Sequence, residues 1–429
     1  MTGLSVFIVT LSVNKFAERS NQIIVSVIFI MRSTSIIAGE FTAGISKVVM
    51  TPVPHEDVVD TLEAGTKTVG NISDPLYIKA LILSDEFSNI AMISLDVMHI
   101  PPMAYAELLA GVRNRGAFDQ VFLSITHTHS GYVGNNNYDA LGEKITSAIQ
   151  AAEANLQPVT IGVAEGQLDE AYNRIIRHSD SNPEMLWTNP DRKPNRDVDQ
   201  SVGVINIKKP SGETLVNIVN YSAHPVVTMD LNNVVISADY PGQLASSLKR
   251  LGEGETMFFL GAAGDVNPYD ADTKPTTLSL EKSNELGEKL ASEVIQTVHT
   301  IKNYQSHGRF SFNTLRYPLS VTKPGDLETA PAEINTLILT DDIALASFSG
   351  EFFSPFSMTL KQESPTTHTL FLGYTNGTLG YIPTKEAVQF GGYGADASDM
   401  WFDVGTGESQ ISDAIESLKT QYQARSVDP

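Results

Sequence analysis

Short apolar runs alternate with amphipathic segments along the chain from residue 41 onward. Apolar runs rich in β-branched residues are typical of strands, and apolar residues that recur every three to four positions are typical of helices. We predict strands at 76–84, 90–96, 121–129, 202–209, 215–223, 257–263 and 342–350. We predict helices at 104–114, 139–154, 241–251, 280–300 and 411–421. This alternation indicates an α/β fold with mixed β-sheets flanked by helices.

Two long polar stretches, 178–198 and 389–410, interrupt this pattern and are predicted to be loops. They contain both tryptophans of the chain, Trp187 and Trp401. Because loops of this length are often functional, we expect the tryptophans either to contact a substrate or to anchor the loops.

Composition narrows the class of protein. The chain has 429 residues, of which 41% are hydrophobic, enough for a large core, and we expect residues 39–429 to form a single domain of catalytic size. The net charge of −21 argues against a nucleic-acid partner and against docking on acidic lipids. With no cysteine, disulfides, cysteine nucleophiles and thiolate metal sites are excluded.

Residues 1–38 are predicted to lie outside the folded domain. Lys15 and Arg19 precede the apolar run IIVSVIFIM at 23–31, which is too short to span a bilayer. The segment is either a secretory leader or a non-native extension upstream of a start at Met31. A leader would place the protein in the periplasm or outside the cell, and an extension would leave it in the cytoplasm. In neither case do we expect stable membrane insertion.

The segment SITHTHSGY at 124–132 places two histidines at the end of a predicted strand. Side chains alternate along a strand, so His127 and His129 should share the face of Leu123 and Ile125, about 7 Å apart. The pair indicates either metal binding or acid–base chemistry, or else two hydrogen-bonded structural histidines.

Three other predicted strands also end in polar residues. His224 follows one, Asp265 and Asn267 follow the next, and Glu351 follows the last. Ligands gather at the carboxyl ends of strands in α/β proteins, and imidazoles with a carboxylate suit Zn²⁺. We therefore expect a zinc site there, although Glu351 could instead be a helix-terminus carboxylate and Asp265 a brace for its turn.

Several blocks in this order resemble the neutral/alkaline (non-lysosomal) ceramidases, zinc amidases that cleave the N-acyl bond of ceramide. The resemblance covers roughly residues 41–400. The matching blocks are FTAGISKVVMTP (41–52), DPLYIKALIL (74–83), ISLD (93–96), THTHSG (126–131), AYNR (171–174), HPVVTMDLNNVVISADYPG (224–242), GAAGDVNP (261–268), GEF (350–352) and GYIPT (380–384).

The resemblance implies roles for seven residues. The residues that it implies as zinc ligands are His127, His224, Glu351 and Tyr381. It places His129 beside the metal as an acid–base group, and it places Arg174 and Tyr393 opposite the scissile carbonyl. Either His129 or Asp239 could pass a proton to the leaving amine.

Three departures from the family pattern bear on the substrate. Asn267 stands where the ceramidases have a serine, FFSPFSMTLKQ differs from the family sequence after Glu351, and we expect no immunoglobulin-like C-terminal domain. We expect a zinc amidohydrolase that acts on a small or lipid-like N-acyl substrate. A zinc hydrolase of an ester, lactone or phosphoester is the alternative, and a non-catalytic binding protein is a third class.

Overall fold

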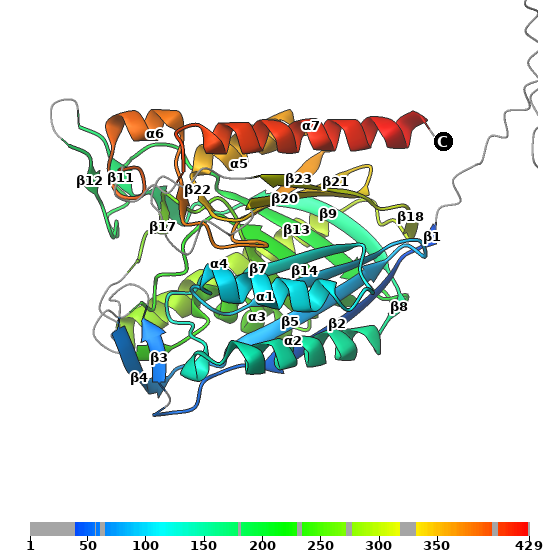
Figure 1. Ribbon diagram of the computed structural model, residues 1–429, viewed down its shortest axis with the longest axis horizontal. Helices are drawn as coiled ribbons and strands as arrows, with labels where there is room; N and C mark the ends of the chain where they lie inside the picture. The colour runs from blue at the N-terminus through cyan, green and yellow to red at the C-terminus, as the bar shows by residue number, and fades with distance from the viewer. Residues whose placement is uncertain are drawn as a thin grey trace, which may run out of the picture.

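Three β-sheets lie between layers of helices in the computed structural model (Figure 1). The structure describes residues 39–55, 57–60, 65–178, 182–229, 234–271, 277–317, 332–396 and 402–427. The predicted N-terminal leader or extension at 1–38 and Trp401 lie outside these residues.

Each of the three sheets is antiparallel except for one parallel pair of strands. The first sheet has the order β7 (Gln120–Ile125), β6 (Asn89–Leu95), β5 (Tyr77–Ser84), β2 (Thr42–Val49) and β8 (Gln157–Pro158). The second has the order β16 (Glu255–Leu260), β14 (Thr214–Tyr221), β13 (Ser201–Lys208) and β9 (Thr160–Gln167). The third has the order β19 (Ser311–Tyr317), β20 (Ala332–Thr340), β21 (Ile343–Phe348) and β23 (His368–Leu372). The parallel pairs are β6–β7, β14–β16 and β21–β23.

Helices cover the outer faces of this stack. Contacts to the first sheet come from α1 (Pro102–Arg113) and α2 (Tyr138–Glu153), and contacts to the second come from α3 (Asp239–Arg250) and α4 (Thr277–Thr300). The third sheet is covered by α5 (Ser354–Glu363) and α7 (Thr406–Val427), seen at the top of Figure 1. None of the helices in the described ranges is long and apolar enough to cross a membrane.

Shorter pieces complete the described chain. The three-stranded sheet is β15 (Val234–Ile236), β4 (Gly65–Ile72) and β3 (Asp57–Asp60). The two-stranded pairs are β1 (Gly39–Glu40) with β18 (His307–Gly308), β10 (Ala171–Asn173) with β17 (Val266–Pro268), β11 (Ile175–Ile176) with β12 (Glu184–Met185), and β22 (Glu351–Phe352) with β24 (Tyr381–Ile382). The helical pieces are the 3₁₀ turn η1 (Gly134–Asn136) and α6 (Lys385–Phe390).

The central strands are apolar on both faces because each face is covered. In β7, Val121, Leu123 and Ile125 belong to a core shared with the helices, whereas Phe122 belongs to a second core between the sheets. Strands buried on both faces are expected to read as continuous apolar runs. A third core lies between the third sheet, α5 and α7.

The predicted α/β class is confirmed, with mixed sheets flanked by helices. Every predicted strand and helix overlaps an observed one, but several boundaries differ from the prediction. The strand predicted at 121–129 ends at Ile125, because His127 adopts a left-handed φ of 63°. The predicted loop at 389–410 is shorter, because α7 already begins at Thr406.

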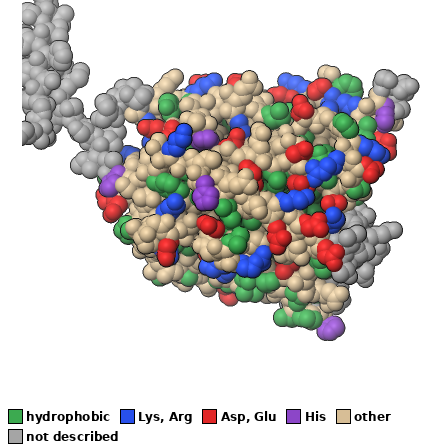
Figure 2. Space-filling model, turned by 180° about the vertical axis from the view of Figure 1, so that it is seen from behind, with side chains coloured by type: hydrophobic (Ala, Val, Ile, Leu, Met, Phe, Trp, Pro, Cys, Tyr) green, Lys and Arg blue, Asp and Glu red, His purple; other side chains and the backbone are tan. Residues whose placement is uncertain are grey.

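The charged surface is mixed. Figure 2 shows acidic side chains interspersed with Lys and Arg over one face of the molecule. The net charge of −21 is therefore accompanied by basic groups among the acidic ones on that face.

Candidate functional site

Chain segments from all three sheets converge on one buried cluster. His127 lies just beyond β7 of the first sheet, and His224 lies just beyond β14 of the second. Glu351 opens β22, which follows β21 of the third sheet. The Glu351 carboxylate lies 3.0 Å from His224 Nε2 and 3.7 Å from His127 Nε2. These strand ends bring together residues more than 200 positions apart in the sequence.

The tautomers of two imidazoles are fixed by backbone carbonyls. His127 Nδ1 lies 2.6 Å from Met98 O, and His224 Nδ1 lies 3.1 Å from Val266 O. A carbonyl oxygen can only accept, so each Nδ1 carries the proton and each Nε2 presents a lone pair. This is how metal-binding histidines are usually oriented.

His129 points into the same cluster. Its Nε2 lies 3.2 Å from His127 Nε2, and its Nδ1 lies 3.2 Å from Met229 Sδ. The predicted spacing of about 7 Å along a strand was therefore wrong. The turn at His127 folds the two rings together, with centroids 4.7 Å apart. Ring nitrogens of His127, His129 and His224 lie within 4.8 Å of one another and could hold a metal ion.

Burial sets the charge of the cluster. It lowers the pKa of His127 to about 4 and that of His129 well below its ordinary value, so both rings are neutral at pH 7. Burial alone would raise the pKa of Glu351, but the neighbouring His127 and His224 and the hydrogen bond from the Tyr374 hydroxyl outweigh burial and hold this pKa below its usual range. The cluster thus presents neutral imidazoles and one carboxylate, the protonation states that metal binding requires.

Tyr381 is placed by strand register. It pairs with Glu351 in the parallel β22–β24 ladder, and the Glu351 amide donates to Gly380 O at 2.8 Å. Gly264 packs so closely against this ladder that a Cβ at its position would lie only 2.6 Å from Glu351 O, so a glycine is needed there. The Tyr381 hydroxyl accepts a hydrogen bond of 3.1 Å from Arg174 Nη2.

Arg174 and Tyr393 also lie together. The Arg174 guanidinium is 4.9 Å from the centroid of the Tyr393 ring, and that ring packs 5.5 Å from Tyr381. Arg174 is 1% exposed and is held by Gly264 O at 2.8 Å and by Asn267 Oδ1 at 3.2 Å. Tyr393 is 38% exposed, so it can meet a molecule arriving from solvent.

Asp239 lies apart from this group. Its carboxylate is fully buried and accepts hydrogen bonds from Thr228 N at 2.8 Å, from Thr228 Oγ1 at 2.9 Å and from the Tyr240 amide. Thr228 in turn contacts Ser130, so Asp239 supports the loop after the histidine pair. The structure brings the other seven predicted residues into one region, whereas Asp239 contacts the loop that supports this region.

Two neighbours of the cluster were absent from the sequence-based prediction. The Tyr374 hydroxyl donates to Glu351 Oε1, and its ring lies 4.4 Å from that of His127. His99 is near enough for the Glu351 charge to act on it, although burial lowers its pKa. His99 follows predicted strand 90–96, and its position near that strand end was the signal that could have found it.

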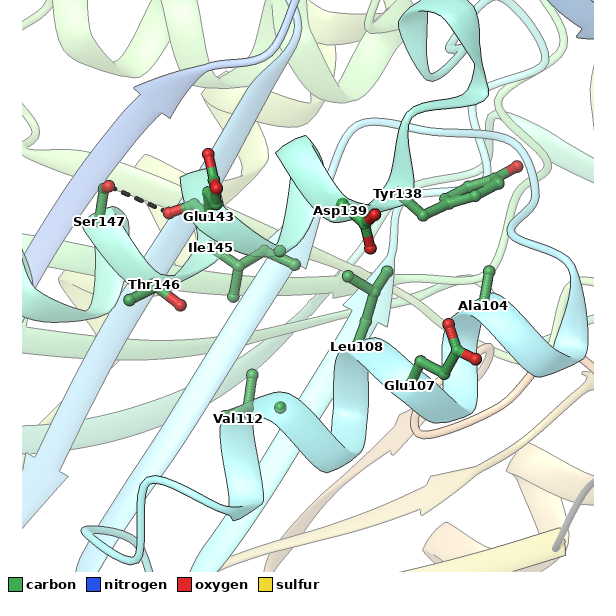
Figure 3. A pocket seen from close by; sticks show the side chains of 12 residues that line it. Ala104, Glu107, Leu108, Val112, Tyr138, Asp139, Glu143, Ile145, Thr146 and Ser147 are labelled. Atoms are coloured by element: carbon green, nitrogen blue, oxygen red, sulfur yellow. Dashed lines mark hydrogen bonds between the residues drawn. The ribbon is translucent and has the colours of Figure 1, made fainter.

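Two cavities of the structure differ in their relation to the histidine cluster. One of about 540 Å³ lies between α1 and α2, with Leu108, Val112 and Ile145 between the helices (Figure 3). It is lined by no residue of the histidine cluster. A smaller cavity of about 170 Å³ is lined by Met98 and His99, and it borders the cluster because Met98 O accepts from His127.

Comparison with known proteins points to one family. Neutral ceramidase A of Dictyostelium discoideum is 28% identical over 180 residues, which cover 37% of this chain and 24% of that relative. A neutral ceramidase from Pseudomonas aeruginosa superposes on 90% of this chain and 75% of its own, with a TM-score of 0.73 and 15% identity. A ceramidase complexed with C2 gives the same score and identity, covering 76% of its chain. No protein-family model matches.

The resemblance to neutral ceramidases is confirmed. The solved ceramidases establish the shared fold, and the sequence match to the Dictyostelium protein spans about a quarter of that relative's length.

Proposed function

We propose that this chain is a zinc-dependent hydrolase that cleaves an N-acyl amide bond. His127, His224, Glu351 and Tyr381 would hold the metal. One observation carries the proposal. Both ligand histidines donate through Nδ1 to carbonyls, yet their Nε2 lone pairs face a buried carboxylate. A shared cation would satisfy three acceptors that otherwise face one another, and nitrogen with oxygen donors suits Zn²⁺.

Zinc at this set would supply a hydrolytic water with its pKa lowered toward about 7 and would polarise the substrate carbonyl. Arg174 would donate to the carbonyl oxygen as negative charge develops there, and the Tyr393 hydroxyl would add a second donor. Gly264 O and Asn267 Oδ1 hold the Arg174 guanidinium close to both tyrosine rings, 5.6 Å from the Tyr381 centroid and 4.9 Å from the Tyr393 centroid. Such preorganised donors cost no reorganisation during reaction.

His129 would handle the proton. Its ring is buried and neutral, and its Nε2 faces the ligand cluster. An amine is a poor leaving group until it is protonated, so His129 would accept the proton released by the attacking water and deliver it to the departing nitrogen. The hydrogen bonds of the Asp239 carboxylate go to Thr228 and Tyr240 rather than to the cluster, so this step is not assigned to Asp239.

The bond specificity is tested with purified full-length protein. We expect one zinc per chain by elemental analysis, loss of activity with a chelator, and recovery with added Zn²⁺. For each substrate we compare the enzymatic rate with the uncatalysed rate in water. We expect this rate enhancement to be larger for an amide than for an ester, lactone or phosphoester of similar size. Zinc without amide cleavage but with turnover of an ester or phosphoester would support the alternative. Zinc-free protein would refute the metal assignment.

The substrate is expected to be short-chained and soluble. A substrate reaches Arg174 past Tyr393, against which Trp187 packs edge-on at 6.4 Å. The charge of −21 opposes close approach to anionic lipid surfaces. We expect kcat/KM for short N-acyl amines to exceed that for a C16 ceramide in mixed micelles. A clear preference for the C16 ceramide, also seen in neutral detergent, would make long-chain ceramide the substrate.

A further inference from the structure

Tyr374 contacts two of the proposed metal ligands at once. Its hydroxyl donates to Glu351 Oε1, and its ring lies 4.4 Å from the His127 ring at an interplanar angle of 30°. We propose that Tyr374 is a positioning residue that fixes the Glu351 carboxylate and the His127 imidazole for metal binding. This inference rests on the proposed metal-dependent function.

The two carboxylate oxygens of Glu351 have separate partners. Oε2 faces His224 Nε2 at 3.0 Å, whereas Oε1 faces His127 at 3.7 Å and accepts the Tyr374 hydroxyl. The terminal torsion of a glutamate is soft, so a carboxylate without a second partner samples several orientations. The Tyr374 hydroxyl removes that freedom by holding Oε1.

Tyr374 and Tyr381 differ in how their hydroxyls are used. The Tyr381 hydroxyl accepts from Arg174, which can only donate, so its oxygen is turned toward a cation. The Tyr374 hydroxyl donates to a carboxylate, so its proton is committed. The arrangement of Tyr381 is suited to a metal ligand, and the arrangement of Tyr374 is suited to a residue that orients a metal ligand.

The backbone places Tyr374 between the strand ends. It adopts a left-handed φ of 44° in the turn after β23. Its amide donates to Gly350 O, next to Glu351, and its carbonyl accepts from Ile125, the last residue of β7, both at 3.3 Å. Asn376 extends this link to β7, since its side chain bonds Leu123 N at 2.8 Å and Val121 O at 2.7 Å. The turn thus joins the segment that carries His127 to the one that carries Glu351.

The test compares Tyr374→Phe with Tyr105→Phe. The first removes only the hydroxyl and keeps the ring against His127. Tyr105 is the matched control: it is also buried, and its hydroxyl bonds Leu123 O and the Asn376 amide in the same turn, yet none of its hydrogen bonds reaches His127, His224, Glu351 or Tyr381. Zinc affinity is measured on the apo-proteins by competition with a chromogenic chelator, and the Co²⁺ absorption spectrum reports the ligand geometry.

We expect Y374F to bind Zn²⁺ about 10- to 100-fold more weakly than the wild type and to give an altered Co²⁺ spectrum, the usual consequence of losing a group that orients a ligand. Y105F should stay within about twofold of the wild type. Wild-type affinity in Y374F, or an equal loss in Y105F, would overturn the proposal. So would a Y374F chain that fails to fold while Y105F folds, because Tyr374 would then be a stability residue. A wild-type protein that binds no metal would instead refute the proposed function.

Discussion

Replacement of Asp239 by Asn distinguishes support of the loop from proton transfer. The φ of Asp239 is 52°, a region that asparagine tolerates, so the backbone should not be strained. Its buried carboxylate accepts two hydrogen bonds from Thr228 and one from Tyr240. Asparagine keeps one acceptor oxygen, which leaves at least one buried donor without a partner. We expect Asp239→Asn to lower the free energy of unfolding by about 1–3 kcal/mol.

The pH dependence of this loss has a definite sign. Burial raises the pKa of Asp239 to about 6, from 3.8. Between about pH 4 and pH 6 the folded chain keeps a proton that the unfolded chain has released, so this group's contribution to stability falls as pH rises. The asparagine variant lacks this titration. Its destabilisation should therefore be larger at pH 4 than at pH 7, by up to about 3 kcal/mol.

Urea unfolding at both pH values, with kcat measured on the folded fraction, provides the assay. We expect kcat within about threefold of the wild type, because Asp239 bonds the loop and not the cluster. In a double-mutant cycle, Thr228→Val should show coupling with D239N of about 0.5–3 kcal/mol. Wild-type stability together with a loss of about 100-fold in kcat would refute this reasoning and make Asp239 the proton donor.

Two further predictions concern the histidines. His127→Ala and His224→Ala should each lose stoichiometric zinc, because each removes a lone pair that faces Glu351. His299→Ala, which changes an exposed histidine, serves as the control. Full zinc occupancy in both His127→Ala and His224→Ala would refute the ligand assignment. His129→Ala should keep most of its zinc but lose about 100-fold or more in kcat/KM, measured on a short N-acyl amine. Zinc loss equal to that of His127→Ala would show that His129 is itself a ligand.

Sequence patterns predicted the elements that are buried on both faces. β6 and β7 read as nearly continuous apolar runs because helices cover one face and a sheet covers the other. Elements with weaker patterns were missed. β9 has the sequence TIGVAEGQ, in which glycine and glutamate interrupt the run, and α5 is a ten-residue helix that opens with Ser-Pro. Tertiary packing decides such segments, and local propensity does not.

The sequence predicted which strand ends contribute residues to the site, but it did not predict how their side chains are arranged relative to one another. His224 and Glu351 stood out because each follows a buried strand. The relation between His127 and His129 could not be derived from alternation, because the left-handed φ of His127 ends the strand pattern. Tyr374 remained hidden for a related reason. It follows β23, and without that strand nothing in the sequence placed it beside Glu351.

Asn267 has a structural role beside the site. Its Oδ1 accepts from Arg174, and its Nδ2 donates to Trp187 O at 2.9 Å. Arginine only donates and a carbonyl only accepts, so these partners fix the orientation of the amide. An amide is not a nucleophile, and both ends of this one are occupied. Asn267 therefore joins the loop of Trp187 to the guanidinium that faces Tyr381 and Tyr393, and its side chain helps to hold Arg174 in place.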